Sequence, residues 1–392
     1  MRSYFLAVSC GMALSLMTGC AAGLQAEVGT APPFSVPDTP DTVRVRILYT
    51  KTPSSLSSTG SYRFQLRKGG KMVAPTGTTR VRAMRSALVF GHQSFKGEVV
   101  AMPSGSSDTL KLNGRRYRGI LVFHPLGSSR YDVVEYVNLE EYLYGVLPRE
   151  VEPKWPIDAL KAQAVVSRTY VLSSKLTATG QRFDVSNGVL DQVYGGQEAE
   201  APESNRAVEE SRGEVLLDQS GKPVQAFFHS SCGGMTELPQ YVWKSSNAAD
   251  VFGCVPDAFC NGDPHYKWQL TISYATIKAR LRRGGIRVRD IKSIAIVQKS
   301  PSGRAEIFSL QTSKGAVEVW GNRFRLALGP EVLRSTLIVN MKAGKSMVSF
   351  EGRGWGHGVG LCQWGAQGRA QAGQTYKQIL ETYYPKAKLS KV

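Results

Sequence analysis

From residue 43 the chain is a series of short runs in which apolar residues alternate with polar ones or stand together. Clusters of Gly, Ser, Asn and Pro separate the runs, which is typical of strands joined by hairpins. The runs are VRVRILY, SYRFQL, SALVFG, GEVVAM, DTLKL, YRGILVF and YDVVEYV. We therefore predict a β-rich N-terminal region over residues 42–130.

The pattern changes to a helical period after residue 150. A long helix is predicted from about Pro156 to Lys175, since proline suits the first helical turn. Shorter helices are predicted near Tyr274–Arg283 and Tyr376–Tyr383, with mixed strands between them. Residues 131–392 are thus expected to form a mixed α/β core, and the fold class is α+β.

Two basic residues of the long helix are out of place on its apolar side. A helical wheel puts Ile157, Leu160, Ala164, Val165, Val171 and Leu172 on one side, and the polar residues on the other. Lys161 and Arg168 share one stripe within the apolar half. A desolvated cation needs a carboxylate, a ligand or a route to water. Extension of one such side chain to solvent is an ordinary explanation, but two cations in register are harder to explain in that way.

Glu150 lies on the turn that leads into this helix. A carboxylate near a helix N-terminus often acts only as an electrostatic cap, worth about 0.3–1 kcal/mol. Glu152 and Asp158 already supply negative charge there. A capping role and a chemical role for Glu150 therefore both stay open on the pattern alone.

The net charge and the N-terminus together indicate the kind of partner. The chain carries 49 Lys and Arg against 31 Asp and Glu, a net charge of +18, which favours polyanionic partners. Residues 1–19 have the form of an export signal, and Leu16–Cys20 is similar to a lipoprotein box in which Cys20 is lipidated. Cleavage near Ala22 by ordinary signal peptidase is the alternative. Residues 20–41 are expected to form a flexible tether.

Export would place the protein outside the cytoplasm, anchored by lipid to a bacterial membrane on its periplasmic or outer side. Export argues against nucleic acid as a partner and favours the acidic cell wall. In an oxidising compartment the four remaining cysteines are expected to pair. They are Cys232, Cys254, Cys260 and Cys362, which allow three pairings, and we favour Cys254 with Cys260 because the loop between them is short.

The glycine-rich block GRGWGHGVGLCQWGAQG supplies further candidate binding residues. Dense glycines allow a ligand or another backbone to approach closely. Gln363 and Trp364 are candidates for ligand binding, as are His357 and, in FFHSSCGG, His229. Each also has a structural alternative, since tryptophan is usually core and histidine often satisfies backbone groups. No Lys-Ser/Thr follows the glycines, which excludes a phosphate loop.

Four segments, taken together, resemble the SpoIID/LytB family of bacterial cell-wall proteins. They are LEEYLYGVLPREV, WPIDALKAQAVVSRTYVLS, FFHSSCGG and FEGRGWGHGVGLCQWGAQGRAQAG…YKQILETYYP, and they occur in the family's order. SpoIID members are lytic transglycosylases that act on peptidoglycan strands stripped of stem peptides, and LytB members are described as amidase enhancers. The resemblance implies that Glu150 is the catalytic glutamate and that Lys161 and Arg168 are the family's helix lysine and arginine.

The chain departs from the family in one segment. Some members hold zinc in a segment resembling DxC…HCQVYG, which here is FDVSNGVLDQVYGG. Ser186, Leu190 and Asp191 replace the cysteine, histidine and second cysteine, so that zinc site is expected to be absent, and no metal or cofactor is expected for the protein. A cluster of His229, Cys232, Cys254 and Cys260 offers suitable donor types, but its spacing matches no zinc signature.

The chemistry implied by the resemblance needs only one carboxyl group. A lytic transglycosylase uses the sugar's own 6-hydroxyl as nucleophile, so Glu150 would act first as acid and then as base. It must then be protonated near neutral pH, which requires partial burial against groups such as Trp155. We place Lys161 and Arg168 toward the muramic acid lactyl carboxylate. The alternative is a wall-binding protein that enhances an N-acetylmuramoyl-L-alanine amidase without catalysis.

Overall fold

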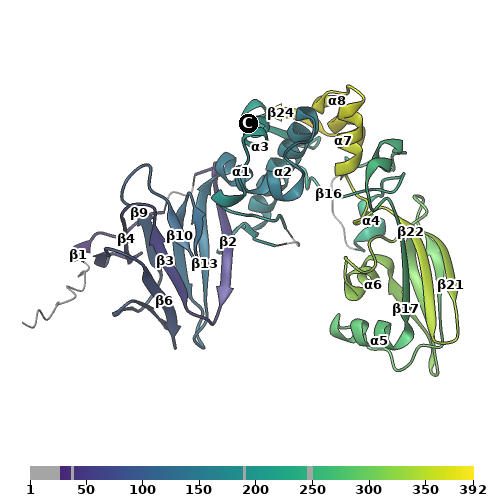
Figure 1. Ribbon diagram of the computed structural model, residues 1–392, viewed down its shortest axis with the longest axis horizontal. Coiled ribbons are helices and arrows are strands. Elements are labelled where there is room, and N and C mark those ends of the chain that lie inside the picture. The colour runs from purple at the N-terminus through teal and green to yellow at the C-terminus, as the bar shows by residue number, and fades with distance from the viewer. Residues whose placement is uncertain (1–26, 37–38, 189–190, 245–249) are drawn as a thin grey trace, which may run out of the picture.

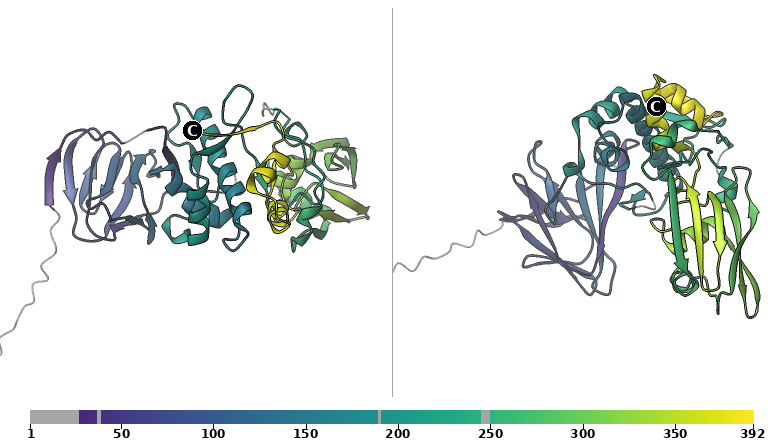
Figure 2. Two further views of the ribbon diagram at one scale, coloured as in Figure 1. Left: turned by 90° about the horizontal axis from the view of Figure 1, so that it is seen from above. Right: turned by 45° about the vertical axis from the view of Figure 1, so that its right-hand side comes forward.

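The computed structural model describes residues 27–36, 39–188, 191–244 and 250–392. It has three parts in a row: an N-terminal β-sandwich, a central group of helices and a second β-rich lobe (Figure 1). Both β-rich parts extend from the same side of the helices, as Figure 1 and the right-hand view of Figure 2 show. The predicted α+β class is confirmed. The predicted signal peptide and Cys20 lie outside the described residues.

The sandwich packs an eight-stranded sheet against a six-stranded one around a common apolar core. The first sheet has the order β1 (Glu27–Ala31), β5 (Gly70–Ala74), β4 (Tyr62–Leu66), β9 (Val99–Pro103), β12 (Ile120–Pro125), β13 (Tyr131–Asn138), β2 (Thr42–Thr50) and β14 (Val185–Ser186). The second has the order β11 (Arg115–Tyr117), β10 (Leu110–Leu112), β3 (Ser54–Ser58), β6 (Thr79–Met84), β7 (Ala87–Phe90) and β8 (Gln93–Phe95).

Two sequence-based boundaries differ from this arrangement. Part of the expected tether forms strand β1, which pairs antiparallel with β5 and so covers backbone groups at the edge of the sheet. The first sheet also continues past residue 130, since β13 pairs with both β12 and β2. The β-rich region therefore leads without a break into the helical part.

Helix α1 (Leu139–Glu150) follows β13 directly and was not predicted. Asn138 caps its N-terminus by accepting a hydrogen bond from the Glu140 N–H. Gly145 and Pro148 disfavour a helix by propensity. Buried Leu143, Val146 and Leu147 override that preference by packing into the sandwich core. Glu150 is thus the last residue of a helix and not part of an isolated turn.

Helix α2 (Ile157–Thr177) occupies the centre of the molecule and is buried on more than one side. Its Leu160 and Ala164 belong to the core shared with the sandwich, whereas Val165 and Val166 belong to a second core. The predicted polar face is therefore wrong, because Gln163 and its polar neighbours are buried as well. Among the described residues, no helix is long and apolar enough to cross a membrane.

The second core lies under the C-terminal helices and contains several segments distant in sequence. These segments are β15 (Glu214–Leu217), β16 (Phe228–His229), α4 (Pro239–Val242), η2 (Ala258–Gly262), β23 (Leu361–Cys362), α7 (Gln363–Gln371), α8 (Tyr376–Tyr383) and β24 (Lys388–Lys391). The neighbouring η1 (Gln197–Ala199) and α3 (Pro202–Glu210) contact α1, and Ala207 and Val208 of α3 belong to the first core. The terminal strand β24 pairs with β15, which brings the C-terminus back to the central helices (Figure 1).

The second β-rich lobe interrupts this part and has a core of its own. It contains β17 (Lys267–Ser273), α5 (Tyr274–Arg283), β18 (Ser293–Lys299), β19 (Ala305–Thr312), β20 (Gly315–Trp320), α6 (Gly321–Leu328), β21 (Ile338–Ala343) and β22 (Met347–Arg353). Two three-stranded antiparallel sheets form it. The hydrophobic pattern did not indicate that residues 131–392 contain such a separate packing unit.

Candidate active site

A cavity of about 260 Å³ lies at the C-terminal end of α1. Its lining comes from three separate parts of the chain: Pro148, Arg149, Glu150, Val151, Glu152 and Trp155, then Ser230, then Gln363 and Trp364. The structure thus brings together three of the predicted site residues, Glu150, Gln363 and Trp364. The same cavity includes Trp155, the apolar group expected beside the glutamate.

The environment of Glu150 favours its protonated form. Its side chain is half-buried, and Oε1 accepts a hydrogen bond from the Val193 N–H at 2.8 Å. Burial raises the pKa of Glu150 to about 7, while hydrogen bonds from Val193 and from the Gln363 side chain oppose the shift. The negative end of the α1 dipole also lies here. A carboxyl group with such a pKa can serve as acid and as base near neutral pH.

A hydrogen-bonded loop holds Val193 against Glu150. The Ser186 hydroxyl donates to Asp191 Oδ2 at 2.5 Å, and the Ser186 N–H donates to the same oxygen at 2.9 Å. Ser186 and Asp191 are two of the three positions at which the sequence departs from the zinc segment of the family that it resembles, and the third, Leu190, lies outside the described residues. In the structure the serine and the aspartate bond to each other.

Two short parallel strands place Ser230 and Gln363 side by side. Strand β16 pairs with β23 so that His229 stands opposite Cys362, and the next residue of each strand lines the cavity. The Trp364 N–H donates to the Ser230 carbonyl at 3.0 Å, which extends the pairing. Gly360 makes the approach possible, because a Cβ there would lie 2.0 Å from the Phe227 carbonyl oxygen.

Two tryptophans form an aromatic wall of the cavity. The rings of Trp155 and Trp364 meet edge to face with centroids 5.1 Å apart, and both are half-buried. Aromatic faces that stay partly accessible are suited to packing on sugar rings. The wall lies in the same cavity as Glu150, whose pKa is raised by burial.

Arg168 does not reach the cavity. Its fully buried guanidinium donates to both oxygens of Glu140, from Nε at 3.0 Å and from Nη2 at 2.7 Å. It also donates to the carbonyls of Val208 and Glu214. The expected contact with a substrate anion is therefore replaced by an internal ion pair that joins α1, α2 and α3.

Lys161 likewise has a protein partner. Its ammonium pairs with Glu210 of α3 and lies 5.7 Å from the centroid of the Tyr376 ring. The helix wheel correctly indicated that both cations need partners, but the partners are carboxylates of this chain.

Of the described residues that line the cavity, Arg149 is the one basic residue, and its side chain is exposed. Sequence reasoning missed it because an arginine in a helix's last turn is unremarkable.

His229 and His357 stand together away from the cavity lining. Their ring centroids are 5.5 Å apart, and Trp243 packs against His357 at 5.1 Å. His229 Nδ1 contacts the Val359 carbonyl at 3.1 Å, and the Val359 N–H donates to His357 Nδ1 at 3.0 Å. Burial lowers the pKa of His357 to about 3 and that of His229 well below its usual value. In this arrangement the two histidines support the glycine-rich block as neutral groups.

The predicted cysteine pair is not formed. All four cysteines are free, and the Cys254 thiol donates to the Thr236 carbonyl at 3.2 Å. Cys260 instead lies with its Sγ 3.4 Å from that of Cys232. The favoured Cys254–Cys260 disulfide is therefore wrong in this structure, because η2 directs Cys260 toward the start of α7.

Comparisons with known proteins agree with the motifs. A family model described as "Stage II sporulation protein" matches residues 127–217, which contain Glu150 and the whole of helix α2. A second, described as a domain of unknown function (DUF8618), matches residues 237–360. The first match covers the part of the chain that carries the central helices and one side of the cavity.

Individual relatives extend the similarity over most of the chain. An uncharacterised protein of Brachyspira hyodysenteriae is 30% identical over 344 residues, 87% of this chain and 91% of that protein. The amidase enhancer of Bacillus subtilis is 31% identical over 332 residues, and stage II sporulation protein D of the same organism is 26% identical over 281 residues. These cover 71% and 68% of this chain, and 45% and 78% of the respective relatives.

These similarities define a protein with a role in the bacterial cell wall. The chain belongs to the SpoIID/LytB family, as its motifs predicted. It spans less than half the length of the amidase enhancer, so that relative has much sequence that this chain does not match. A link to peptidoglycan and to a cell-wall amidase follows at the level of the family.

Proposed function

We propose that this protein is a peptidoglycan lytic transglycosylase that cleaves the bond between N-acetylmuramic acid and N-acetylglucosamine in peptide-stripped strands. The observation that supports this most is Glu150, a half-buried carboxyl group with a pKa of about 7 in an aromatic-walled cavity. A hydrolase of the usual kind needs a second carboxylate as base or nucleophile. The other carboxylate in the lining, Glu152, is exposed to solvent, which suits it poorly to a desolvated catalytic step.

In this reaction Glu150 is the only protein group that gives or takes a proton. Protonated Glu150 gives its proton to the glycosidic oxygen as the bond from that oxygen to C1 of the muramic acid breaks. The resulting carboxylate then takes the proton from the 6-hydroxyl of the same sugar as that oxygen bonds to C1. The products are a free 4-hydroxyl on N-acetylglucosamine and a 1,6-anhydro end. Glu150 is protonated again, and no water is consumed.

Arg149 is the cation placed to recognise a stripped strand. Removing the stem peptide exposes the lactyl carboxylate of muramic acid, and arginine holds a carboxylate with two hydrogen bonds. Since Lys161 and Arg168 pair with Glu210 and Glu140, the exposed guanidinium of Arg149 in the cavity lining takes over the role that we first expected of them.

Arg149→Ala is expected to reduce the preference for stripped over intact strands by about tenfold or more, the value of a charge-assisted hydrogen bond. The measurement is the ratio of kcat/KM on the two kinds of strand. Lys154→Ala is the matched control, because Lys154 is an exposed cation outside the cavity lining, and its ratio should stay unchanged. Equal losses on both substrates for the Arg149 variant would count against recognition of the lactyl group.

The pH dependence of the reaction should report the raised pKa of Glu150. The acid form is needed for the first step, and it predominates below a pKa of about 7. We therefore expect kcat/KM to be near its maximum on the acid side and to fall about tenfold per pH unit well above pH 7. A fall that begins near pH 4.5 would show that burial does not raise the pKa of the catalytic group.

A second function, enhancement of a cell-wall amidase, is supported by the relative that bears that name. It would depend on binding to the wall, which the net charge of +18 favours, and not on the carboxyl group of Glu150.

One experiment distinguishes the two functions. Purified protein and its Glu150→Gln variant are added to stripped strands alone and to intact wall with an amidase. Release of strand fragments only by the wild type supports the transglycosylase, whereas equal stimulation of the amidase by both proteins, with no fragments, supports the enhancer.

A further inference from the structure

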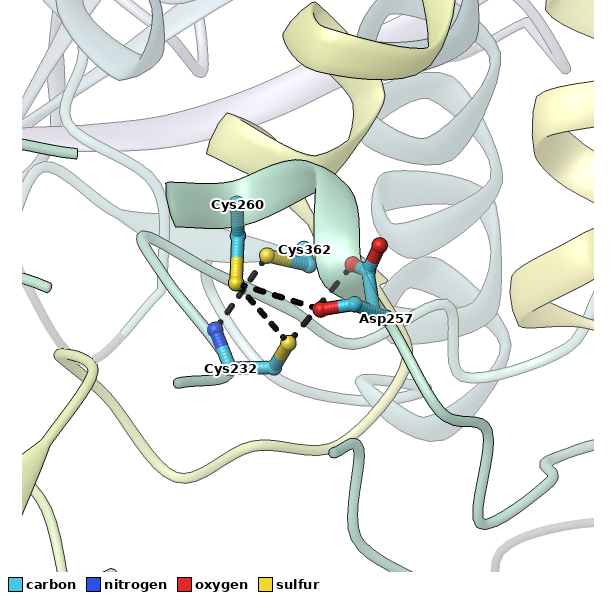
Figure 3. Close-up of side chains that lie close together, drawn as sticks. All are labelled: Cys232, Asp257, Cys260 and Cys362. Carbon is cyan, nitrogen blue, oxygen red and sulfur yellow. Dashed lines mark hydrogen bonds between the residues drawn. The ribbon is translucent and has the colours of Figure 1, made fainter. Parts of the chain in front are cut away.

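A cluster of three thiols and one carboxylate lies directly behind the cavity. Cys232, Asp257, Cys260 and Cys362 are all buried, and their donor atoms lie within 4.8 Å of one another. In Figure 3 the three sulfur atoms point toward a common centre, with the Asp257 carboxylate beside them. The members come from three segments that are distant in the sequence: Cys232, then Asp257 and Cys260 at η2, and then Cys362. Such convergence of soft donors is unlike the packing of isolated buried cysteines.

We propose that these four residues form a structural zinc site. Zn²⁺ is bound tetrahedrally by thiolates, histidines and carboxylates, and sites with four protein ligands are typically structural. A Zn–S bond of about 2.3 Å in a tetrahedron places two sulfurs about 3.8 Å apart. The Sγ atoms of Cys232 and Cys260 are 3.4 Å apart, close to that value, so small side-chain movements suffice. Asp257 and Cys260 also have the two-residue separation common in zinc sites.

The surroundings of the cluster resemble the outer shell of a metal site. Tyr383 donates its hydroxyl proton to Asp257 Oδ2 at 2.6 Å, and Arg369 Nη2 donates to Oδ1 at 3.2 Å. Backbone N–H groups point at sulfur: that of Gly365 donates to Cys362 Sγ at 3.2 Å and that of Gly234 to Cys232 Sγ at 3.4 Å. Such hydrogen bonds orient ligands and stabilise thiolates. Cys362 also caps the N-terminus of α7, where the helix dipole favours a negative sulfur.

A disulfide explains the cluster less well. One bond between Cys232 and Cys260 would leave the Cys362 thiol buried beside it, with two N–H groups still directed at its sulfur. A metal uses all three thiols and the carboxylate together. The site is also distinct from the segment around Ser186 and Asp191, where those two residues bond to each other.

The cluster adjoins the cavity, so a metal bound there would affect the geometry of the active site. Cys362 immediately precedes Gln363 and Trp364, and Cys232 lies two residues after Ser230, so two ligands hold the two strands whose ends line the cavity. Zinc would fix the back wall of the cavity without contacting the substrate. It would also contribute folding free energy to the core under α7 and α8.

The test measures metal in the whole chain, purified in a phosphine reductant without chelator. We expect about one zinc per chain by elemental mass spectrometry, and a Co²⁺-substituted form with intense thiolate-to-cobalt absorption typical of a tetrahedral sulfur site. Cys260→Ser and Cys362→Ser should lower the zinc content at least tenfold. Tyr383→Phe, which removes only a hydrogen bond to Asp257, should weaken zinc affinity about 10- to 100-fold.

Cys254→Ser is the matched control, since Cys254 is free but lies outside the cluster, and its zinc content should equal that of the wild type. The wild-type measurements decide the question even if a ligand variant does not fold. A folded wild-type chain that contains no zinc, takes up none from added ZnCl₂ and shows no thiolate-to-cobalt band would overturn the proposal. Because these readouts are independent of glycan cleavage, they stay valid whichever cell-wall function the chain has.

Discussion

Replacing Glu150 by glutamine is expected to reduce the rate of strand cleavage by about 10²- to 10⁴-fold, the usual contribution of a positioned general acid. Glutamine has nearly the same shape and can still accept the hydrogen bond from Val193 that Glu150 accepts at 2.8 Å. Its amide group, however, is not an acid near neutral pH and cannot give a proton to the glycosidic oxygen. The loss should therefore appear in kcat, with little change in the binding of strands. The measurement is steady-state kinetics on amidase-stripped glycan strands.

Glu152→Gln is the matched control for this prediction. Glu152 lies two residues away and lines the same cavity, but its side chain is exposed. We expect its rate to stay within a few-fold of the wild type. A large loss in both variants would indicate a second essential carboxylate, and hence a hydrolase-like mechanism. Unchanged cleavage by a folded Glu150→Gln protein would exclude Glu150 as the acid.

The second large effect is expected on stability, from Arg168→Ala. The substitution leaves the buried Glu140 carboxylate without its two hydrogen bonds from the guanidinium. Breaking a buried ion pair by removal of one partner costs about 3–5 kcal/mol of the free energy of unfolding. Denaturant unfolding of the purified variants measures this value. The carbonyls of Val208 and Glu214 lose a donor as well, which acts in the same direction.

Two comparisons make this prediction specific. Lys161→Ala removes a partly solvated pair with Glu210 and should change the unfolding free energy little. The double variant Arg168→Met with Glu140→Leu should recover much of the lost stability, since apolar residues of similar volume often replace a buried pair without loss. If Arg168→Ala unfolds like the wild type but binds strands poorly, Arg168 is a substrate residue and the internal role is wrong.

Local sequence signals predicted part of the helical structure. The helices Tyr274–Arg283 and Tyr376–Tyr383 have the predicted bounds, and Ser273 and Thr375 cap their N-termini. Helix α1 was missed because Gly145 and Pro148 argue against a helix locally. Gly145 is required by the tertiary structure, since a Cβ there would lie 2.5 Å from the Tyr194 ring.

The site was predictable only as far as its motifs extend along the sequence. Glu150, Gln363 and Trp364 were identified, and the structure brings them to one cavity. The destinations of Arg168 and Lys161 were not predictable, because Glu140 and Glu210 reach them from other helices. The thiol cluster was missed for the same reason: Cys362 reaches Cys232 only through the pairing of β16 with β23.

The source of oxygen in the new chain ends tests the central claim most directly. Stripped strands are digested by the wild-type protein in ¹⁸O-enriched water, and the product ends are analysed by mass spectrometry. Intramolecular attack by the 6-hydroxyl predicts 1,6-anhydro ends that contain no ¹⁸O, formed by the wild type and not by Glu150→Gln. Reducing ends that carry ¹⁸O would show that water is the nucleophile and would contradict the transglycosylase mechanism.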